Sequence, residues 1–134
     1  MEWKEEYSIQ LPEIDREHQN LVDCVTEIES AFSRREAVQP AIAKLVYLTR
    51  THFTLEETLM RILGYAGLEA HMQEHKKFLA DLKALEQESL TKGLSPESIA
   101  KLNGWLEEHF VSDDRQYALL LSKENKAYMK KYYS

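Results

Sequence analysis

Apolar residues recur every three or four positions along four segments of this chain, and this period constrains the fold more than any other feature. The chain has only four glycines and three prolines, and most of them lie between the segments. Each segment is therefore predicted to form an amphipathic helix that has to bury one face. We expect an all-α protein, folded as an antiparallel up-down-up-down four-helix bundle.

The predicted helices are defined by their apolar stripes and by residues that favour helix ends. Asp15, after the Pro12 turn, is a candidate N-cap for the first helix, and Gly64 is expected to stop the second. Ser95-Pro96-Glu97 has the hydroxyl, proline and acid typical of a helix start. The stripes comprise His18, Leu21, Val25, Ile28 and Phe32; Val38, Ile42, Leu45, Leu48, His52, Glu56, Leu59 and Leu63; His71, His75, Phe78, Leu82 and Leu85; and Ile99, Leu102, Leu106 and His109.

Length and composition indicate one domain over residues 1–134. We expect an extended arm over residues 1–13, the bundle over about 14–112, and a short C-terminal helix within about 113–134. The net charge of −6, with Lys and Arg interleaved among acids, argues against nucleic-acid binding. The acidic N-terminus argues against a signal peptide, and the lack of a long apolar run argues against membrane insertion. With Cys24 as the single cysteine, the expected location is the cytoplasm.

All five histidines of the chain lie on the predicted inward stripes. In an antiparallel bundle, the starts of the first and third helices share one end with the ends of the second and fourth, so the five should converge there. Glu56 follows His52 by four residues and would be a buried carboxylate without a charge partner unless a cation lies nearby. A single His pair is weak evidence, but this coincidence predicts a metal site.

Asp114 lies five residues after His109 and is a further candidate ligand. A step of five residues rotates about 140° on a regular helix, so Asp114 requires the helix to end or to contain a π-type turn there. Asp113, at a step of four, competes with it on spacing alone. Imidazole with carboxylate suits iron, zinc, copper or nickel. Seven protein ligands, with two bridging carboxylates and a bridging oxo or hydroxo group, fit two metal ions with one vacant position.

The chain resembles the bacterial hemerythrins, which are non-haem di-iron oxygen-binding proteins. The resemblance runs from Trp3 to about Asp114 and rests on W-x-x-x-Y-S-I, I-D-R-E-H-Q-N-L, H-F-T-L-E-E-T-L-M, H-M-Q-E-H-K-K-F and W-L-E-E-H-F-V-S-D-D. Two positions depart from the pattern: Gln10 replaces a common glycine, and Glu17 stands where glutamine is often found. Both concern the loop and the outer surface, so they put details of the entry path in doubt more than the metal site.

The resemblance implies a role for each candidate ligand. His71, His75 and His109 would bind one iron, and His18 and His52 the other. Glu56 and Asp114 would bridge the two irons (Fe²⁺/Fe³⁺) together with an oxo or hydroxo group. O2 would bind end-on at the iron with two histidines and be held as hydroperoxide.

The predicted function is therefore reversible oxygen binding for storage, delivery or buffering, and not enzymatic turnover. Di-iron oxidases in four-helix bundles generally use a carboxylate-rich ligand set, whereas imidazoles dominate here. Apolar neighbours of the site, Phe53, Trp105 and Leu106, would exclude water or simply pack the core. The alternatives are a di-iron redox enzyme, such as a peroxidase, oxidase or nitric oxide reductase, and an oxygen or iron sensor. The partner is molecular oxygen, and the sequence does not identify a protein partner.

Overall fold

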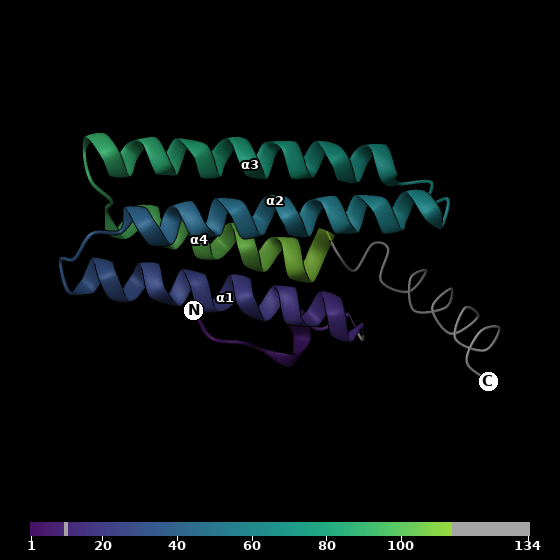
Figure 1. Cartoon of the computed structure of the whole chain (residues 1–134), viewed down its shortest axis with the longest axis horizontal. Helices are drawn as coiled ribbons and strands as arrows, with labels where there is room; N and C mark the ends of the chain where they lie inside the picture. The colour runs from purple at the N-terminus through teal and green to yellow at the C-terminus, as the bar shows by residue number, and fades with distance from the viewer. Residues whose placement is uncertain (10, 114–134) are drawn as a thin grey trace.

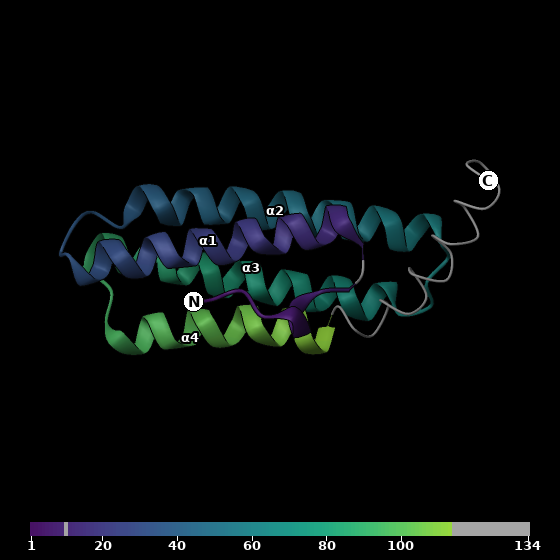
Figure 2. The same ribbon diagram turned by 90° about the horizontal axis from the view of Figure 1, so that it is seen from below.

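Four α-helices form an antiparallel bundle in residues 1–9 and 11–113, which a computed structural model of the chain describes (Figure 1). They are α1 (Pro12–Ser33), α2 (Gln39–Ile62), α3 (Leu68–Thr91) and α4 (Pro96–Glu108). Each helix packs against the next, and α4 also lies against α1, which closes the ring of four (Figure 2). The predicted all-α bundle is confirmed, whereas Asp114 and the expected C-terminal helix lie outside the described residues.

The predicted start of α1 is wrong, whereas the predicted end of α2 and the predicted start of α4 are confirmed. α1 begins at Pro12, with Leu11 as its N-cap, because the fixed φ of proline suits the first helical turn. α2 ends before Gly64, which has the left-handed φ of +66° that favours glycine. At the start of α4, the Ser95 hydroxyl accepts a hydrogen bond from the Ser98 backbone N–H, and the Ser98 hydroxyl accepts one from that of Ser95.

The core follows the predicted stripes in α1, α3 and α4, apart from the partly buried Phe32 and Ile99, but in α2 it is shifted. Thr49, Phe53 and Met60 are fully enclosed, whereas Leu59 and Leu63 are only partly buried. α2 packs between α1 and α3, so its buried face is wider than a single stripe and is centred between them. Phe53 is thereby placed in the core beside His52.

The N-terminal arm is held against α1 and α4 by a short 3-10 turn, Glu5–Tyr7. The Tyr7 ring is buried, contacts Phe110 at 5.0 Å between centroids, and its hydroxyl donates to Glu107 over 3.2 Å. Asp15, in the first turn of α1, accepts a hydrogen bond from the backbone N–H of Ile9 at 2.9 Å. The carboxylate that we expected to cap α1 therefore ties down the arm instead.

None of the helices in the described part of the chain is long and apolar enough to span a bilayer.

Candidate metal centre

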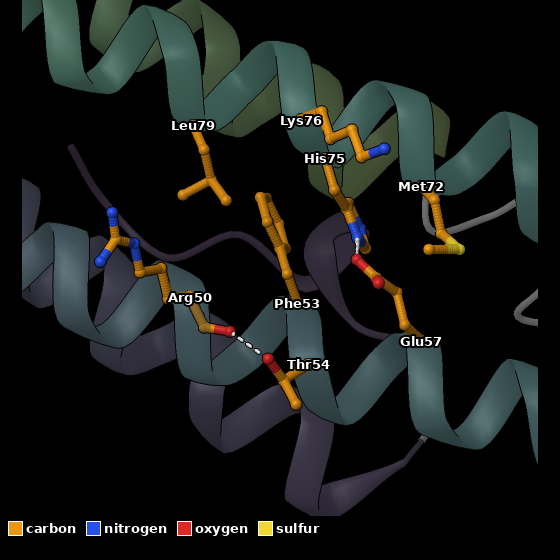
Figure 3. A pocket seen from close by; sticks show the side chains of 8 residues that line it. All are labelled: Arg50, Phe53, Thr54, Glu57, Met72, His75, Lys76 and Leu79. Carbon is orange, nitrogen blue, oxygen red and sulfur yellow. Dashed lines mark hydrogen bonds and ion pairs between the residues drawn. The ribbon is translucent and has the colours of Figure 1, made fainter.

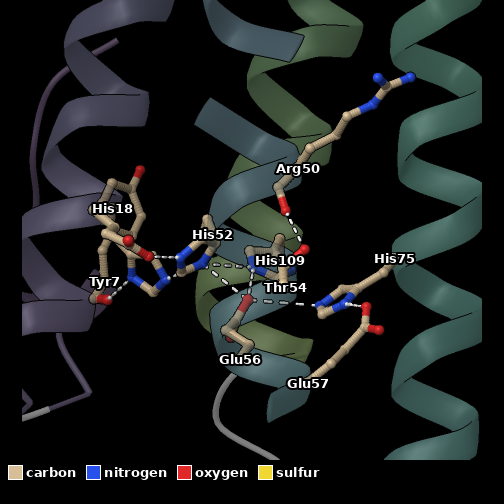
Figure 4. Close-up of polar contacts among 10 residues, drawn as sticks. Tyr7, His18, Arg50, His52, Thr54, Glu56, Glu57, His75 and His109 are labelled. Atoms are coloured by element: carbon tan, nitrogen blue, oxygen red, sulfur yellow. Dashed lines mark hydrogen bonds and ion pairs between the residues drawn. The ribbon is translucent and has the colours of Figure 1, made fainter. Parts of the chain in front are cut away.

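Six of the seven predicted ligands converge at one end of the bundle, as the connectivity predicted. Figure 4 shows five of them, His18, His52, Glu56, His75 and His109. His18 comes from α1, His52 and Glu56 from α2, His71 and His75 from α3, and His109 from the end of α4. All six side chains are at most 2% exposed. Asp114, the seventh, lies outside the described residues.

The six residues form two groups of potential ligand atoms, and Glu56 belongs to both. Within each group the atoms lie no more than 4.8 Å apart. The first group is His18, His52, Glu56 and His109, and the second is Glu56, His71 and His75. Two adjacent ions that share the Glu56 carboxylate would fit this arrangement.

His109 belongs to the first group by its ligand atom, but its ring is equally distant from one histidine of each group. Its ring centroid is 5.6 Å from that of His52 and also 5.6 Å from that of His75. Its Nε2 is 3.5 Å from Nε2 of His52 and 3.1 Å from Oε1 of Glu56. These ring positions are compatible with either division of the histidines, so the assignment of His109 to the ion bound by His71 and His75 stays a prediction.

Glu56 carries the negative charge at the middle of the site. Its Oε1 lies 2.9 Å from Nε2 of His52 and 3.6 Å from Nε2 of His75. Burial acts to raise the pKa of this carboxyl, but positive charge on His52 and His109 and their hydrogen bonds hold it well below the ordinary value of 4.5. The carboxylate therefore needs positive charge beside it to stay ionised, which either protonated histidines or bound metal ions can supply.

The outer nitrogens of three of the histidines face hydrogen-bond acceptors. Nδ1 of His52 lies 2.7 Å from Oε1 of Glu17, and Nδ1 of His75 lies 2.7 Å from Oε2 of Glu57. Nδ1 of His18 lies 3.2 Å from the backbone oxygen of Tyr7. An Nδ1–H that donates to such an acceptor leaves the Nε2 of a neutral ring without a proton.

This protonation pattern creates a conflict that a cation resolves. Nε2 of His18 and Nε2 of His52 are only 3.1 Å apart, so two neutral rings would point their lone pairs at each other inside the core. Nε2 of His75 is also buried and forms no hydrogen bond to any described atom. A metal ion accepts such lone pairs, and the donor set of imidazole and carboxylate fits iron.

Glu17 does not belong to the outer surface alone, so that expectation was wrong. It precedes His18 on α1 and reaches across to His52 on α2. Glu57 likewise follows Glu56 on α2 and reaches His75 on α3. Sequence reasoning missed both contacts because their partners lie on other helices, where residue spacing carries no signal.

A π-helical turn, His109–Asp113, follows α4 directly. This is one of the two local structures that Asp114 requires if it is to reach the site, because a π-type turn brings residues five apart onto the same face. The choice between Asp113 and Asp114 lies outside the side chains that the structure describes.

A groove of about 330 Å³ between α2 and α3 leads to His75 (Figure 3). Phe53 stands in its middle and stacks on the His75 ring, with 3.7 Å between centroids and 2° between planes. Glu57 lies in the same groove. Glu57 and Phe53 therefore stand between the groove and His75, whose side chain remains buried. The lining residues are Arg50, Phe53, Thr54, Glu57, Met72, His75, Lys76 and Leu79.

The other two expected apolar neighbours differ in burial. Leu106 is fully buried, whereas Trp105 is partly exposed and contacts Phe78 at 6.4 Å between ring centroids. Phe110 lies closer to the ligands, with its ring 4.4 Å from that of His18. Aromatic rings thus flank the histidines on two sides.

Comparison with known proteins gives consistent matches. The sequence model of the hemerythrin HHE cation binding domain matches residues 10–121. Myohemerythrin of Riftia pachyptila is 31% identical over 115 residues, which cover 86% of this chain and 88% of that protein. Bacteriohemerythrin of Stenotrophomonas maltophilia is 30% identical over 121 residues, covering 87% and 78%. A wild-type hemerythrin crystal structure superimposes with a TM-score of 0.81 at 25% identity, over 91% of this chain and 98% of that one.

Proposed function

The chain belongs to the hemerythrin family, and on this premise we propose that it binds molecular oxygen reversibly at a pair of non-haem iron ions. One observation carries the proposal. Five buried histidines surround one buried carboxylate that is shared by two groups of ligand atoms. This arrangement fits two metal ions held side by side, with imidazole as the dominant ligand.

Each predicted ligand has a place in the proposed centre. His71, His75 and His109 would hold one iron, His18 and His52 the other, and Glu56 would bridge them. Membership of Glu56 in both ligand groups supports the bridging role. Asp114 is proposed as a second protein bridge, alongside an oxo or hydroxo group, and the π-helical turn that ends at Asp113 supports this choice.

The bound iron pair would supply the electrons that O2 takes up on binding and returns on release. The protein would hold the ligands at fixed distances and keep water away. Phe53 stacks on His75 and Phe110 packs against His18, so aromatic surface takes the place of solvent beside both histidines. Oxygen storage, delivery or buffering would follow from such a site.

The ligand balance supports binding over turnover. The proposed ligand set has five imidazoles and two carboxylates, Glu56 and Asp114, so few anionic ligands are available to stabilise highly oxidised iron. Cleavage of the O–O bond is accordingly disfavoured relative to reversible binding. A peroxidase, oxidase or nitric oxide reductase would be better served by a carboxylate-rich set.

The decisive experiment measures metal and colour together. Protein purified in air should carry about two irons per chain, as expected for a two-metal site. Reduced protein should gain colour with oxygen, lose it under argon and regain it over repeated cycles. Colourless or zinc-filled protein that cannot be loaded with iron would refute the proposal. An oxygen adduct that decays at once while a reductant is consumed would indicate the enzyme instead.

A further inference from the structure

Two carboxylates outside the ligand set approach the candidate ligands in the same way. Glu17 contacts Nδ1 of His52 and Glu57 contacts Nδ1 of His75, each over 2.7 Å. Their side chains are 28% and 23% exposed, whereas that of Glu56 is 0% exposed. Glu17 and Glu57 thus stand at the edge of the site, behind the histidines, while Glu56 stands at its centre.

These contacts determine which nitrogen of each ring faces inward. A carboxylate only accepts hydrogen bonds, so Nδ1 must be the donor, and the lone pair of the neutral ring is on Nε2. Nε2 of His52 points toward Glu56, with 2.9 Å to its Oε1. Nε2 of His75 faces the same oxygen at 3.6 Å. Both rings are therefore held in the orientation and tautomer that a metal ligand needs.

The two carboxylates are distributed evenly over the site. His52 belongs to the first group of ligand atoms and His75 to the second. His18, the other histidine of the proposed two-histidine iron, donates instead to the neutral carbonyl of Tyr7. Each group thus has a histidine backed by a full negative charge. Such a charge raises the basicity of the imidazole and strengthens its bond to the metal.

We propose that Glu17 and Glu57 are paired positioning residues, one for each metal ion, and that their charge stabilises the more highly oxidised state of the bound metals. The proposed effect on metal affinity requires only that the site binds divalent metal. The proposed effect on the oxidation state rests on the proposed function, in which the bound metal is iron. Because the two residues act on different histidines, removing one charge should affect mainly one of the two metal positions.

The test uses the full chain with Glu17→Gln, Glu57→Gln and the double variant. Glutamine keeps an oxygen that accepts the Nδ1–H but removes the charge. Metal-free protein is titrated with cobalt(II), and binding is followed by visible absorption. We expect each single variant to weaken one of two binding steps by about 10-fold, the lower end of effects typical for such partners, and the double variant to weaken both. In iron-loaded protein, the midpoint potential should move to a more positive value.

Glu88→Gln is the matched control, because Glu88 accepts a 2.6 Å hydrogen bond from Ser98 near the opposite end of α3. Circular dichroism of each variant verifies that the helices are intact. Variants that bind cobalt as tightly as Glu88→Gln, while the wild type binds two ions, would overturn this inference and leave the proposed function standing. A wild type that binds no metal would overturn the proposed function and this inference together.

Discussion

At the scale of single residues, His75 is restrained more completely than an ordinary core side chain. Phe53 stacks on its ring, Glu57 accepts from its Nδ1, and its Nε2 faces the carboxylate of Glu56. A histidine that only filled the core would not need a carboxylate on its outer edge and an unpaired nitrogen on its inner one. The arrangement is that of a ligand held ready for a metal ion.

Replacing this ligand should lower the iron content. His75→Ala removes one donor from the ion that His71, His75 and His109 are proposed to hold. We therefore expect the iron bound per chain, measured by inductively coupled plasma mass spectrometry, to fall from about two toward one. Phe78→Leu, a change in the same helix one turn further on, is the control for packing and should retain iron. Full iron loading of His75→Ala would contradict the ligand assignment.

Cys24 gives a pH-dependent prediction that is independent of the metal site. The thiol is fully buried and donates to the Ala41 carbonyl over 3.2 Å, and burial, with a smaller contribution from the charge of Glu27, raises its pKa from 9.0 to about 11. The folded state therefore holds the neutral thiol after the unfolded chain has begun to ionise. Because the thiol ionises more readily in the unfolded chain, its contribution to the free energy of unfolding is fully present below pH 9. This contribution is lost as the pH rises toward 11.

The measurement is urea unfolding of the wild type and of Cys24→Ala between pH 8 and pH 11, in the presence of reductant. Cys24→Ala lacks the ionisation, so the free-energy advantage of the wild type should shrink by roughly 2 kcal/mol across this range. A constant difference between the two proteins would show that the thiol does not change its pKa on folding.

At the scale of elements, α4 leads directly into the π-helical turn that begins at the candidate ligand His109. Gly104 lies in the middle of this helix, and a Cβ placed there meets nothing within 4 Å. Glycine in a helix interior is less favourable than alanine, since it loses more backbone freedom on folding. Gly104→Ala should therefore raise the free energy of unfolding by about 0.5–1 kcal/mol, measured with urea.

Gly64→Ala is the matched comparison. Its added Cβ would also meet nothing within 4 Å, but the φ of +66° is strained for alanine. We expect this variant to lose about 1 kcal/mol, so the same chemical change should have opposite signs at the two positions. Equal effects would mean that backbone conformation does not govern them.

The start of α4 offers a second prediction for this helix. The Ser95 hydroxyl accepts a hydrogen bond from the backbone N–H of Ser98 at 3.2 Å, which satisfies a donor in the first turn of α4. Ser95→Ala should cost about 1 kcal/mol of stability in urea unfolding. Thr91→Ala removes a hydroxyl that only bonds back within the end of α3 and should change stability by less than half as much. Equal losses would contradict the capping role.

At the scale of the whole molecule, the period of the sequence predicted the four helices and the antiparallel order predicted that the histidines meet. Both are properties of single helices and short connections, which local sequence records. The contacts of Glu17 with His52 and of Glu57 with His75 cross between helices, so no spacing along the chain reveals them. The shifted buried face of α2 likewise depends on its two neighbours.

The whole bundle should also depend on its metal. Without a metal ion, the buried Glu56 depends on positively charged histidines, and the Nε2 atoms of His18 and His52, 3.1 Å apart, need a proton between them. Both arrangements place charge on imidazole rings inside the core, which is unfavourable. A ligand that binds only the folded state stabilises it by about 3 kcal/mol when its free concentration is 100 times the dissociation constant. For a domain of this size, that corresponds to roughly 10 °C in Tm.

Chelation tests this dependence. Protein stripped of iron with a chelator under reducing conditions should melt roughly 10 °C below the loaded form and recover when iron(II) is returned. The fall in melting temperature on chelation should be smaller in the double variant Glu17→Gln/Glu57→Gln. This variant is expected to bind metal less tightly, so bound metal stabilises its folded state less. Identical melting of loaded and stripped wild-type protein would show that the buried ligands are satisfied without a cation, which would remove the physical basis of the metal assignment.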